Sequence, residues 1–354
     1  MEIITKIAVR KVLHSGIREV DFENLEFGKF IADHMLISDY NDNEWDLPRI
    51  VPYADISLSP AALALHYGQT VFEGMKAFRM ADGRINIFRM EKHHERFNRS
   101  LHRMCMPAVP EEIFVEGLMQ LIQLDKDWVP GKEGSALYIR PFMYASEAKM
   151  GLQVSNGYRF LTFTGPVPTL YSKPIKVKVE TEYIRAARGG TGFAKCGGNY
   201  GGALYPTQKA KEQGYDQVLW TRGEDIKFIE ESGMMNAMFV IGGTLITAPL
   251  SDTILDGVTR DSLLTLAKDL GIPIEERPVS VDELRKAFIN RSVTEAFGAG
   301  TAAVVAPIQT IGIEGIDYHL PAYNDKSILN ILKNSLERIR SGRQEDTHQW
   351  NFIF

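Results

Sequence analysis

The apolar segments of this chain follow one another as runs of strand length, and this order limits the folds that the chain can adopt. Two such runs occupy residues 136–145 and 158–167, and residues 216–248 have the pattern of a meander with glycine turns. Strands joined by short turns pair antiparallel, whereas parallel neighbours need a long crossover, usually a helix. The order therefore predicts an α+β protein rather than a regular alternation of strands and helices.

Helical periodicity is found in other parts of the chain. Phe97, Leu101 and Met104 recur at i, i+4 and i+7, which predicts a helix over residues 91–104. Further helices are expected over residues 111–124, 260–270, 282–289 and 326–341. Their core faces are expected to include Phe114, Leu118, Leu121 and Ile122 in the first and Leu329, Leu332, Leu336 and Ile339 in the last. Additional strands are expected over residues 84–89, 175–180, 226–230, 293–298 and 302–306.

The length of 354 residues suggests about two domains. Three prolines fall between residues 166 and 174, and clustered prolines are typical of a connection between domains. We therefore expect a small α/β domain over residues 1–166, an interdomain loop over residues 167–174 and a larger domain over residues 175–354.

The composition excludes several classes of protein. Hydrophobic residues make up 44% and charged residues 24%, a mixture that supports a folded core rather than a disordered chain. A net charge of −5 without a Lys/Arg-rich run gives no indication of nucleic acid or of an anionic membrane as a partner. Two cysteines cannot form a disulfide framework, and the eight histidines are too scattered to predict a metal site. The first residues lack the apolar core of a secretory signal, so we expect a cytoplasmic enzyme.

Glycines gather around one lysine. Residues 189–202 contain seven glycines in fourteen positions, with Lys195 in their midst. Glycine lets a backbone approach a ligand closely, and a lysine amine of lowered pKa can form a Schiff base with an aldehyde cofactor. A surface loop with an exposed lysine explains the composition equally well. The spacing matches neither a Walker A loop nor a Rossmann glycine motif.

Three further segments could bind an anion or a cation. Residues 256–262 open a helix, whose N-terminus could bind phosphate or could simply be capped by a threonine. Glu230 and Glu231 stand between two strands, where one could pair with a protonated ring nitrogen or both could be solvated. Residues 298–302 could form a nest of backbone N–H groups for a carboxylate, or a plain β-turn. Taken one at a time, the structural explanation is favoured for each.

Together, these segments resemble the branched-chain-amino-acid aminotransferases, a fold-type-IV family that uses pyridoxal 5'-phosphate (PLP). The resemblance extends over most of the chain and is carried by residues 27–35, 72–78, 137–141, 195–200, 257–260 and 300–302. It implies a two-domain fold like that of D-amino acid aminotransferase, with PLP in the larger domain. It also implies a transferase that moves the amino group of L-leucine, L-isoleucine or L-valine to 2-oxoglutarate by a ping-pong mechanism, giving branched-chain 2-oxo acids and L-glutamate.

The resemblance assigns cofactor-binding roles. Lys195 would hold PLP as a Schiff base and transfer the proton during catalysis, Tyr200 would bind the 3'-oxygen, and Glu231 would face the pyridine nitrogen. The phosphate would be bound by Arg89, by the backbone N–H groups of Val258 and Thr259, and in part by Thr301.

The resemblance also assigns the substrate pocket. Its apolar wall would consist of Phe27, Tyr67, Phe72 and Tyr138. Arg140 with Tyr138 would bind the side-chain carboxylate of glutamate, and Thr301 and Ala302 would bind the α-carboxylate. Tyr67 and the loop at residues 150–152 would come from the neighbouring subunit, which implies a homodimer with shared active sites.

Two alternatives and two departures accompany this resemblance. A D-amino acid aminotransferase or an aminodeoxychorismate lyase would share the fold and the lysine, and a non-catalytic PLP-binding protein is a more distant alternative. Met234 stands where some animal members have a threonine that contacts PLP. Ala303 and Ala306 stand where some animal members have a Cys-x-x-Cys pair, so redox control of that kind is excluded here.

Overall fold

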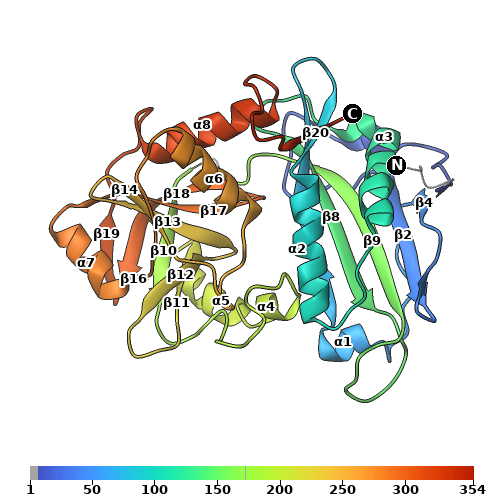
Figure 1. The fold of residues 1–354 in the computed structure, drawn as a ribbon, viewed down its shortest axis with the longest axis horizontal. Helices are drawn as coiled ribbons and strands as arrows, with labels where there is room; N and C mark the ends of the chain where they lie inside the picture. Colours follow the sequence, from blue (N-terminus) through green and yellow to red (C-terminus); the bar gives the residue numbers. More distant parts are fainter. Residues whose placement is uncertain (1–6, 172) are drawn as a thin grey trace. The chain divides into compact units, whose positions relative to one another are not determined.

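The computed structural model describes residues 7–171 and 173–354 (Figure 1). It divides into two compact units. Unit 1 comprises Met1–Leu170, Ala194–Gly198 and Arg340–Phe354, and unit 2 comprises Tyr171–Phe193 and Asn199–Ile339. Residues 1–6 of the expected first domain and Ser172 of the expected interdomain loop lie outside the described residues. The expected boundaries at residues 166 and 175 stay predictions.

Unit 1 is built on a ten-stranded sheet in the order β1-β4-β2-β9-β8-β6-β7-β20, with β3 paired to β2 and β5 paired to β8. Its strands are β1 (Ala8–Val9), β2 (His34–Asn41), β3 (Glu44–Trp45), β4 (Arg49–Pro52), β5 (Thr70–Phe72), β6 (Met75–Arg79), β7 (Ile85–Phe88), β8 (Ala136–Ala145), β9 (Tyr158–Val167) and β20 (Asn351–Ile353). Strands β8 and β9 pair antiparallel over their whole length, from Ala136 opposite Val167 to Ala145 opposite Tyr158.

Helices cover one face of this sheet. They are α1 (Leu63–Tyr67), α2 (Met90–Arg103), a π-helical turn (Glu112–Glu116) that continues into α3 (Gly117–Leu124), and two short 3-10 turns (Gly16–Glu19 and Lys126–Trp128). Figure 1 shows α2 and α3 lying against the sheet. Between them, the rings of Phe97 and Phe114 lie 5.7 Å apart and that of Phe160 lies 5.8 Å from Phe97. Burial of these rings stabilises the unit by about 2–3 kcal/mol for each side chain.

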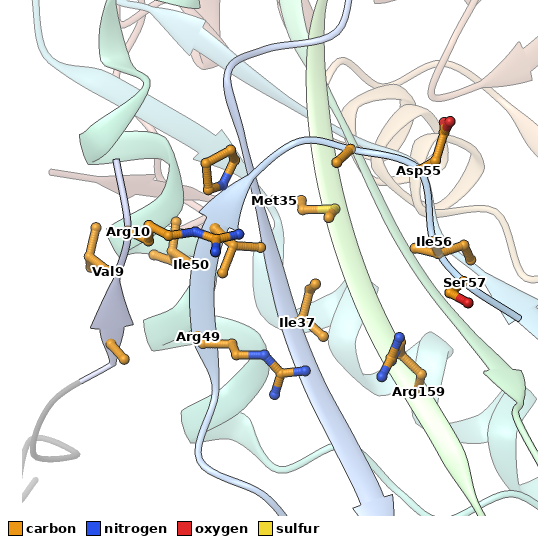
Figure 2. Close-up of a pocket in the computed structure, with 14 residues that line it drawn as sticks. Val9, Arg10, Met35, Ile37, Arg49, Ile50, Asp55, Ile56, Ser57 and Arg159 are labelled. Atoms are coloured by element: carbon orange, nitrogen blue, oxygen red, sulfur yellow. The ribbon is translucent and has the colours of Figure 1, made fainter. Parts of the chain in front are cut away.

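The opposite face of the unit 1 sheet carries a second apolar cluster. Because side chains alternate along a strand, Leu36 of β2 points to the helices while Met35 and Ile37 point to the other face. A pocket of about 480 Å³ opens beside Met35 and Ile37, and Arg49 and Arg159 also line it (Figure 2). Both arginines bind Asp39, at 2.8 and 2.5 Å.

Unit 2 is built on a second ten-stranded sheet in the order β15-β14-β13-β17-β18-β10-β11-β12-β16, with β19 paired to β18. Its strands are β10 (Ile175–Glu180), β11 (Gln217–Thr221), β12 (Phe228–Ser232), β13 (Met235–Ile241), β14 (Thr244–Thr247), β15 (Ile274–Glu276), β16 (Val279–Ser280), β17 (Val293–Gly300), β18 (Val304–Ile313) and β19 (Ile316–His319). Because β12 also pairs with β13, the strands from β13 through β17, β18, β10 and β11 to β12 close into a ring.

The helices associated with unit 2 are α4 (Gly198–Gly201), α5 (Leu204–Glu212), α6 (Val258–Asp269), α7 (Val281–Ile289) and α8 (Ile328–Arg340). The expected stripe of α8 is confirmed, since Leu329, Leu332, Leu336 and Ile339 are at most 2% exposed. Among residues 7–171 and 173–354, no helix is long and apolar enough to span a bilayer.

The expected elements are largely confirmed, with local corrections. Strands β8, β9 and β10 begin and end where the apolar patterns predict. The strand expected over residues 226–230 begins at Phe228 instead, because Ile226 is 59% exposed in the preceding loop. The strand expected from residue 302 begins at Val304, because residues 301–303 form a turn.

Candidate active site

Lys195 is bound to unit 1 through its backbone. Its N–H donates to the Ser100 hydroxyl at 2.9 Å, and its C=O accepts the Phe72 N–H at 3.0 Å. Cys196 forms a bridge with Val71, and Gly197 donates to the Thr70 carbonyl at 3.2 Å. The segment therefore runs alongside β5 and is joined to it by these hydrogen bonds and an isolated bridge. The alternative of an exposed lysine is wrong, because Lys195 is half-buried.

One glycine of the cluster has a steric reason for being glycine. A Cβ at Gly197 would lie 2.5 Å from the Thr70 hydroxyl oxygen, closer than real Cβ contacts. A side chain there would push the segment away from β5, so Gly197 permits the close approach that fixes Lys195.

The Lys195 amine lies over an aromatic face. Its Nζ is 4.6 Å from the centroid of the Phe72 ring, within the range of a cation–π contact. Phe72 therefore contacts Lys195 twice, once through its backbone N–H and once through its ring.

An arginine and three aromatic rings gather beside this lysine. The Arg140 guanidinium carbon lies 4.8 Å from the Phe72 centroid and 5.2 Å from that of Tyr138. Arg140 Nη2 donates to the Tyr138 hydroxyl at 3.1 Å, while its buried Nε has no protein hydrogen-bond partner. The Phe27 ring packs edge-on against Tyr138 at 5.3 Å. Four predicted substrate-binding residues are thus in one group with Lys195.

A second glycine makes room for Tyr138. A Cβ at Gly74 would collide with the Tyr138 hydroxyl oxygen. Position 74 must therefore be glycine to leave space for the Tyr138 hydroxyl, which accepts the hydrogen bond from Arg140.

Two predicted residues of unit 1 belong to other groups of contacts. The Tyr67 hydroxyl accepts the Gly151 N–H at 3.1 Å, so Tyr67 holds the 146–156 loop. Arg89 follows β7 as the N-cap of α2 with a left-handed φ of 52°, and its guanidinium lies 5.0 Å from the Trp350 ring. Its N–H donates to the Trp350 carbonyl at 2.7 Å.

A buried ion pair was not predicted from the sequence. Glu73, which is fully buried, accepts from Arg96 Nε at 2.6 Å and from Arg96 Nη2 at 2.8 Å. His93 Nδ1 lies 3.0 Å from the second carboxylate oxygen. The sequence did contain one signal for this buried pair. The polar residues at positions 93, 96 and 100 fall on the same side of the expected helix as the apolar Phe97.

Burial and charge set the protonation of this group. Burial raises the pKa of Glu73, but Arg96 and His93 outweigh it and hold the pKa well below its usual range. Burial lowers the pKa of His93 in spite of the neighbouring carboxylate. Glu73 is therefore ionised and paired with Arg96 at neutral pH, while His93 is neutral.

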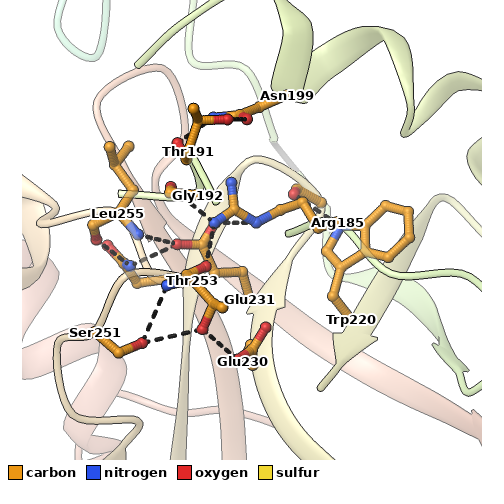
Figure 3. Close-up of polar contacts among 12 residues, drawn as sticks. Arg185, Thr191, Gly192, Asn199, Trp220, Glu230, Glu231, Ser251, Thr253 and Leu255 are labelled. Atoms are coloured by element: carbon orange, nitrogen blue, oxygen red, sulfur yellow. Dashed lines mark hydrogen bonds and ion pairs between the residues drawn. The ribbon is translucent and has the colours of Figure 1, made fainter. Parts of the chain in front are cut away.

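In unit 2, Glu231 lies in a dense set of polar contacts (Figure 3). It is 2% exposed, and its Oε1 accepts the Leu255 N–H at 2.7 Å and the Asn236 amide at 3.3 Å. Arg185 Nε lies 3.2 Å from Oε2. The two hydrogen bonds and the nearby Arg185 charge favour the ionised carboxylate in a nearly dry environment.

The neighbouring Glu230 has different partners. It accepts from the Thr253 hydroxyl at 2.5 Å and from Arg222 Nε at 3.2 Å. Glu230 is also 2% exposed, so the alternative that both carboxylates are solvated is wrong.

The start of α6 has no side-chain cap. Its N-cap is Gly257, and Val258 and Thr259 are the first helical residues, 2% and 8% exposed. The threonine-cap alternative is therefore wrong, because Thr259 lies inside the helix. Asn236 connects this turn to Glu231, since its amide also donates to the Leu255 carbonyl at 2.9 Å. The backbone N–H groups and the helix dipole favour an anion at this end.

The other predicted residues of unit 2 lie in two turns and in α4. Thr301 and Ala302 form the hairpin between β17 and β18, which Gly300 closes opposite Val304. Val304 adopts a φ of +63°, which is strained for a β-branched residue. Tyr200 lies in α4, next to Asn199. The Asn199 side-chain amide donates to the Thr191 carbonyl and accepts from the Thr191 hydroxyl. Met234 is 65% exposed in the β12–β13 turn.

Comparisons with known proteins identify the family. The model of the amino-transferase class IV family matches residues 70–311. A relative from Bacillus subtilis, "Branched-chain-amino-acid transaminase 1", is 46% identical over 300 residues, which cover 83% of this chain and 84% of that one. The chain belongs to the branched-chain-amino-acid aminotransferases. Like them, this aminotransferase is an enzyme of the α+β fold-type-IV class.

Solved structures of the branched-chain aminotransferases have the same fold. One from Thermoproteus uzoniensis, with norvaline, aligns with a TM-score of 0.74 at 25% identity and covers 90% of this chain and 99% of that chain. Another, from Thermobaculum terrenum in its PLP form, has a TM-score of 0.74 at 22% identity and covers 91% of this chain and 98% of that chain.

Proposed function

We propose that this aminotransferase moves the amino group of L-leucine, L-isoleucine or L-valine to 2-oxoglutarate, with PLP as cofactor and a ping-pong mechanism. The observation that carries the substrate assignment is the Arg140–Tyr138 pair within the aromatic group beside Lys195. Such a group offers an apolar wall for an aliphatic side chain and a cation for a side-chain carboxylate. The two half-reactions require both features.

The residues present fit PLP. The half-buried Lys195 amine would attach the aldehyde, and the buried Glu231 carboxylate would face the pyridine nitrogen. The phosphate would be bound by Arg89, Thr301 and the backbone N–H groups of Val258 and Thr259 at the uncapped end of α6. Tyr200 would bind the 3'-oxygen. When bound, PLP supplies the electron sink for the substrate carbanion.

Side chains of the protein would transfer the substrate proton and balance the charge of the cofactor ring. Lys195 would move the proton between the substrate α-carbon and the C4' atom of the cofactor, in opposite directions in the two half-reactions, which requires a neutral amine when it accepts the proton. The Phe72 ring limits the positions of Nζ. Arg185, at 3.2 Å, and the Leu255 N–H would favour the anionic form of Glu231, so that this carboxylate could hold a protonated ring nitrogen.

Arg140 would distinguish the two kinds of substrate. Its Nη2 is held by Tyr138, and its Nε lacks a protein partner, so the guanidinium has donor capacity for a ligand carboxylate. Leaving such a carboxylate buried without a partner would cost several kcal/mol. The α-carboxylate would bind to the backbone of Thr301 and Ala302.

We further propose a homodimer that completes each active site with residues of the partner. Met150 and Leu152 are 90% and 83% exposed, and Tyr67 holds their loop through Gly151. Apolar side chains exposed to this extent on one loop are typical of a protein interface. The expected cytoplasmic location belongs to the same proposal.

A spectroscopic titration tests the function. Purified enzyme with PLP should change its visible absorption on addition of L-leucine and recover it on addition of 2-oxoglutarate. A coupled assay should show L-glutamate formation from L-leucine, and D-alanine should give no turnover. Activity with D-alanine but not with L-leucine would reject the proposal. Lys195→Ala should abolish turnover while it retains part of the PLP through the phosphate contacts.

A further inference from the structure

We propose that Ser100 is a positioning residue for Lys195, and that the buried Glu73–Arg96 pair holds Ser100 in place. This inference rests on the proposed role of Lys195 as the reacting amine. It extends that role to three residues of unit 1 that have no assigned part in the reaction.

The backbone of Lys195 is held from two sides. On one side its N–H donates to Ser100 Oγ at 2.9 Å, and Ser100 belongs to α2. On the other side its C=O accepts the N–H of Phe72, the last residue of β5, at 3.0 Å. Lys195 therefore lies between a helix and a strand, and its position depends on the distance between them.

The Ser100 hydroxyl is itself oriented. Its Oγ donates to the Arg96 carbonyl at 3.0 Å, which directs an oxygen lone pair to the Lys195 N–H. Ser100 is 1% exposed, so water has little access to replace the hydroxyl if it is removed. An alanine at this position would leave the Lys195 N–H without its acceptor.

The Glu73–Arg96 pair fixes the helix to the strand. Glu73 directly follows Phe72, and its carboxylate binds the Arg96 guanidinium through two hydrogen bonds of 2.6 and 2.8 Å. Arg96 is in turn the residue whose carbonyl orients Ser100. The two peptide contacts of Lys195 and this ion pair thus connect α2, β5 and the lysine segment in one closed set of bonds.

Such a set of bonds has a function in positioning. A lysine side chain has four rotatable bonds, so its amine reaches a defined point only when the backbone is fixed. Small displacements of a reacting group lower the rate strongly, because the reacting atoms no longer meet in the productive geometry. Fixing the Lys195 peptide therefore leaves the side-chain torsions as the main freedom of the amine.

The test compares Ser100→Ala with Ser335→Ala. Ser335 of α8 makes the same hydrogen bond to the carbonyl four residues earlier, at 2.9 Å to Ile331, and is the matched control. Hydrogen exchange of the Lys195 amide is measured in the holoenzyme by overlapping peptides, together with kcat and KM for L-leucine. Ser100→Ala should speed exchange of this amide and lower kcat by about tenfold, with KM changed less than about twofold. Ser335→Ala should change neither quantity.

Ser100→Thr keeps the hydroxyl and should restore the slow exchange and most of kcat. If Ser100→Ala does not fold, Ser100→Cys provides the weaker acceptor, and it should show faster exchange of the Lys195 amide and a lower kcat than the wild type. Unchanged exchange of the Lys195 amide in Ser100→Ala, or a kcat equal to that of Ser335→Ala, would overturn the positioning role. Wild-type enzyme without leucine turnover would instead reject the proposed function, and the exchange measurement would still test the contact.

Discussion

Arg185 Nε lies 3.2 Å from Glu231 Oε2, and the two side chains are only 10% and 3% exposed. The Leu255 N–H donates to the other carboxylate oxygen of Glu231 at 2.7 Å. These contacts favour the ionised form of the carboxylate, which is the form that the proposed pairing with a protonated pyridine nitrogen requires.

Glu231→Gln should therefore lower kcat by about a hundredfold or more, because the amide cannot hold the ring nitrogen in its protonated form. The variant should also change the visible absorption of bound PLP. Glu230→Gln is the control, since Glu230 is equally buried but binds Thr253 and Arg222 instead. Equal effects of the two substitutions on kcat would argue against the assignment of Glu231.

Glu73→Ala should lower the free energy of unfolding by about 3–5 kcal/mol, because it leaves the Arg96 charge buried and unpaired. Urea denaturation measures this loss. The control is Glu26→Ala, which removes an exposed pair with Lys29 and should cost at most about 0.5 kcal/mol. A loss in Glu73→Ala as small as that in the control would show that the pair contributes little.

The titration of His93 and Glu73 predicts how the free energy of unfolding depends on pH. Burial lowers the pKa of His93 below 6.5, so the unfolded chain binds the proton more readily than the folded one. The free energy of unfolding should therefore decrease as the pH falls below about 6.5. Glu73 has a pKa well below 4.5, so its contribution is present above pH 4.5 and is lost as the pH falls towards its folded value.

Urea unfolding of the wild type and of His93→Gln between pH 5 and pH 8 separates the contribution of His93 from that of Glu73. The variant should lose the part of the slope that lies just below pH 6.5. Identical slopes would mean that His93 titrates alike in both states.

Arg140→Met should affect the two half-reactions unequally. It removes the cation beside Phe72 and Tyr138 but keeps an apolar side chain of similar length. We expect kcat/KM for 2-oxoglutarate to fall by about a hundredfold, and that for L-leucine by less than about fivefold. Tyr138→Phe, which removes the hydroxyl that binds Nη2, should give a smaller loss in the same direction. Equal losses for both substrates in Arg140→Met would contradict the role in side-chain carboxylate binding.

The sequence predicted the elements whose apolar pattern is complete. Strands β8 and β9 and the buried stripe of α8 follow directly from such patterns. Ile226 misled the assignment of β12, since a single apolar residue does not reveal whether tertiary contacts cover it.

The polar parts of the site were harder to predict. The sequence alone did not show that Glu73 and Arg96 pair, because they belong to different elements and their contact depends on how α2 packs against β5. Nor did it show that both Glu230 and Glu231 are buried, since their partners Thr253 and Leu255 come from a later loop. Family resemblance pointed to Glu231, and the contacts of the two acids now give a physical reason to test them separately.

The exposed loop of unit 1 yields a prediction about assembly. Leu152 is 83% exposed and Met150 90%, and Tyr67 holds Gly151 between them at 3.1 Å. An aspartate at position 152 would place a charge in the proposed apolar interface, where it would lose hydration without gaining a partner. Leu152→Asp should therefore shift the enzyme towards monomers in sedimentation experiments and lower its activity in proportion, because each site would lose the partner's loop. Leu13→Asp, at a leucine of the N-terminal region that is 94% exposed, should remain dimeric and active. A Leu152→Asp variant that stays dimeric at low micromolar concentration would place the interface elsewhere.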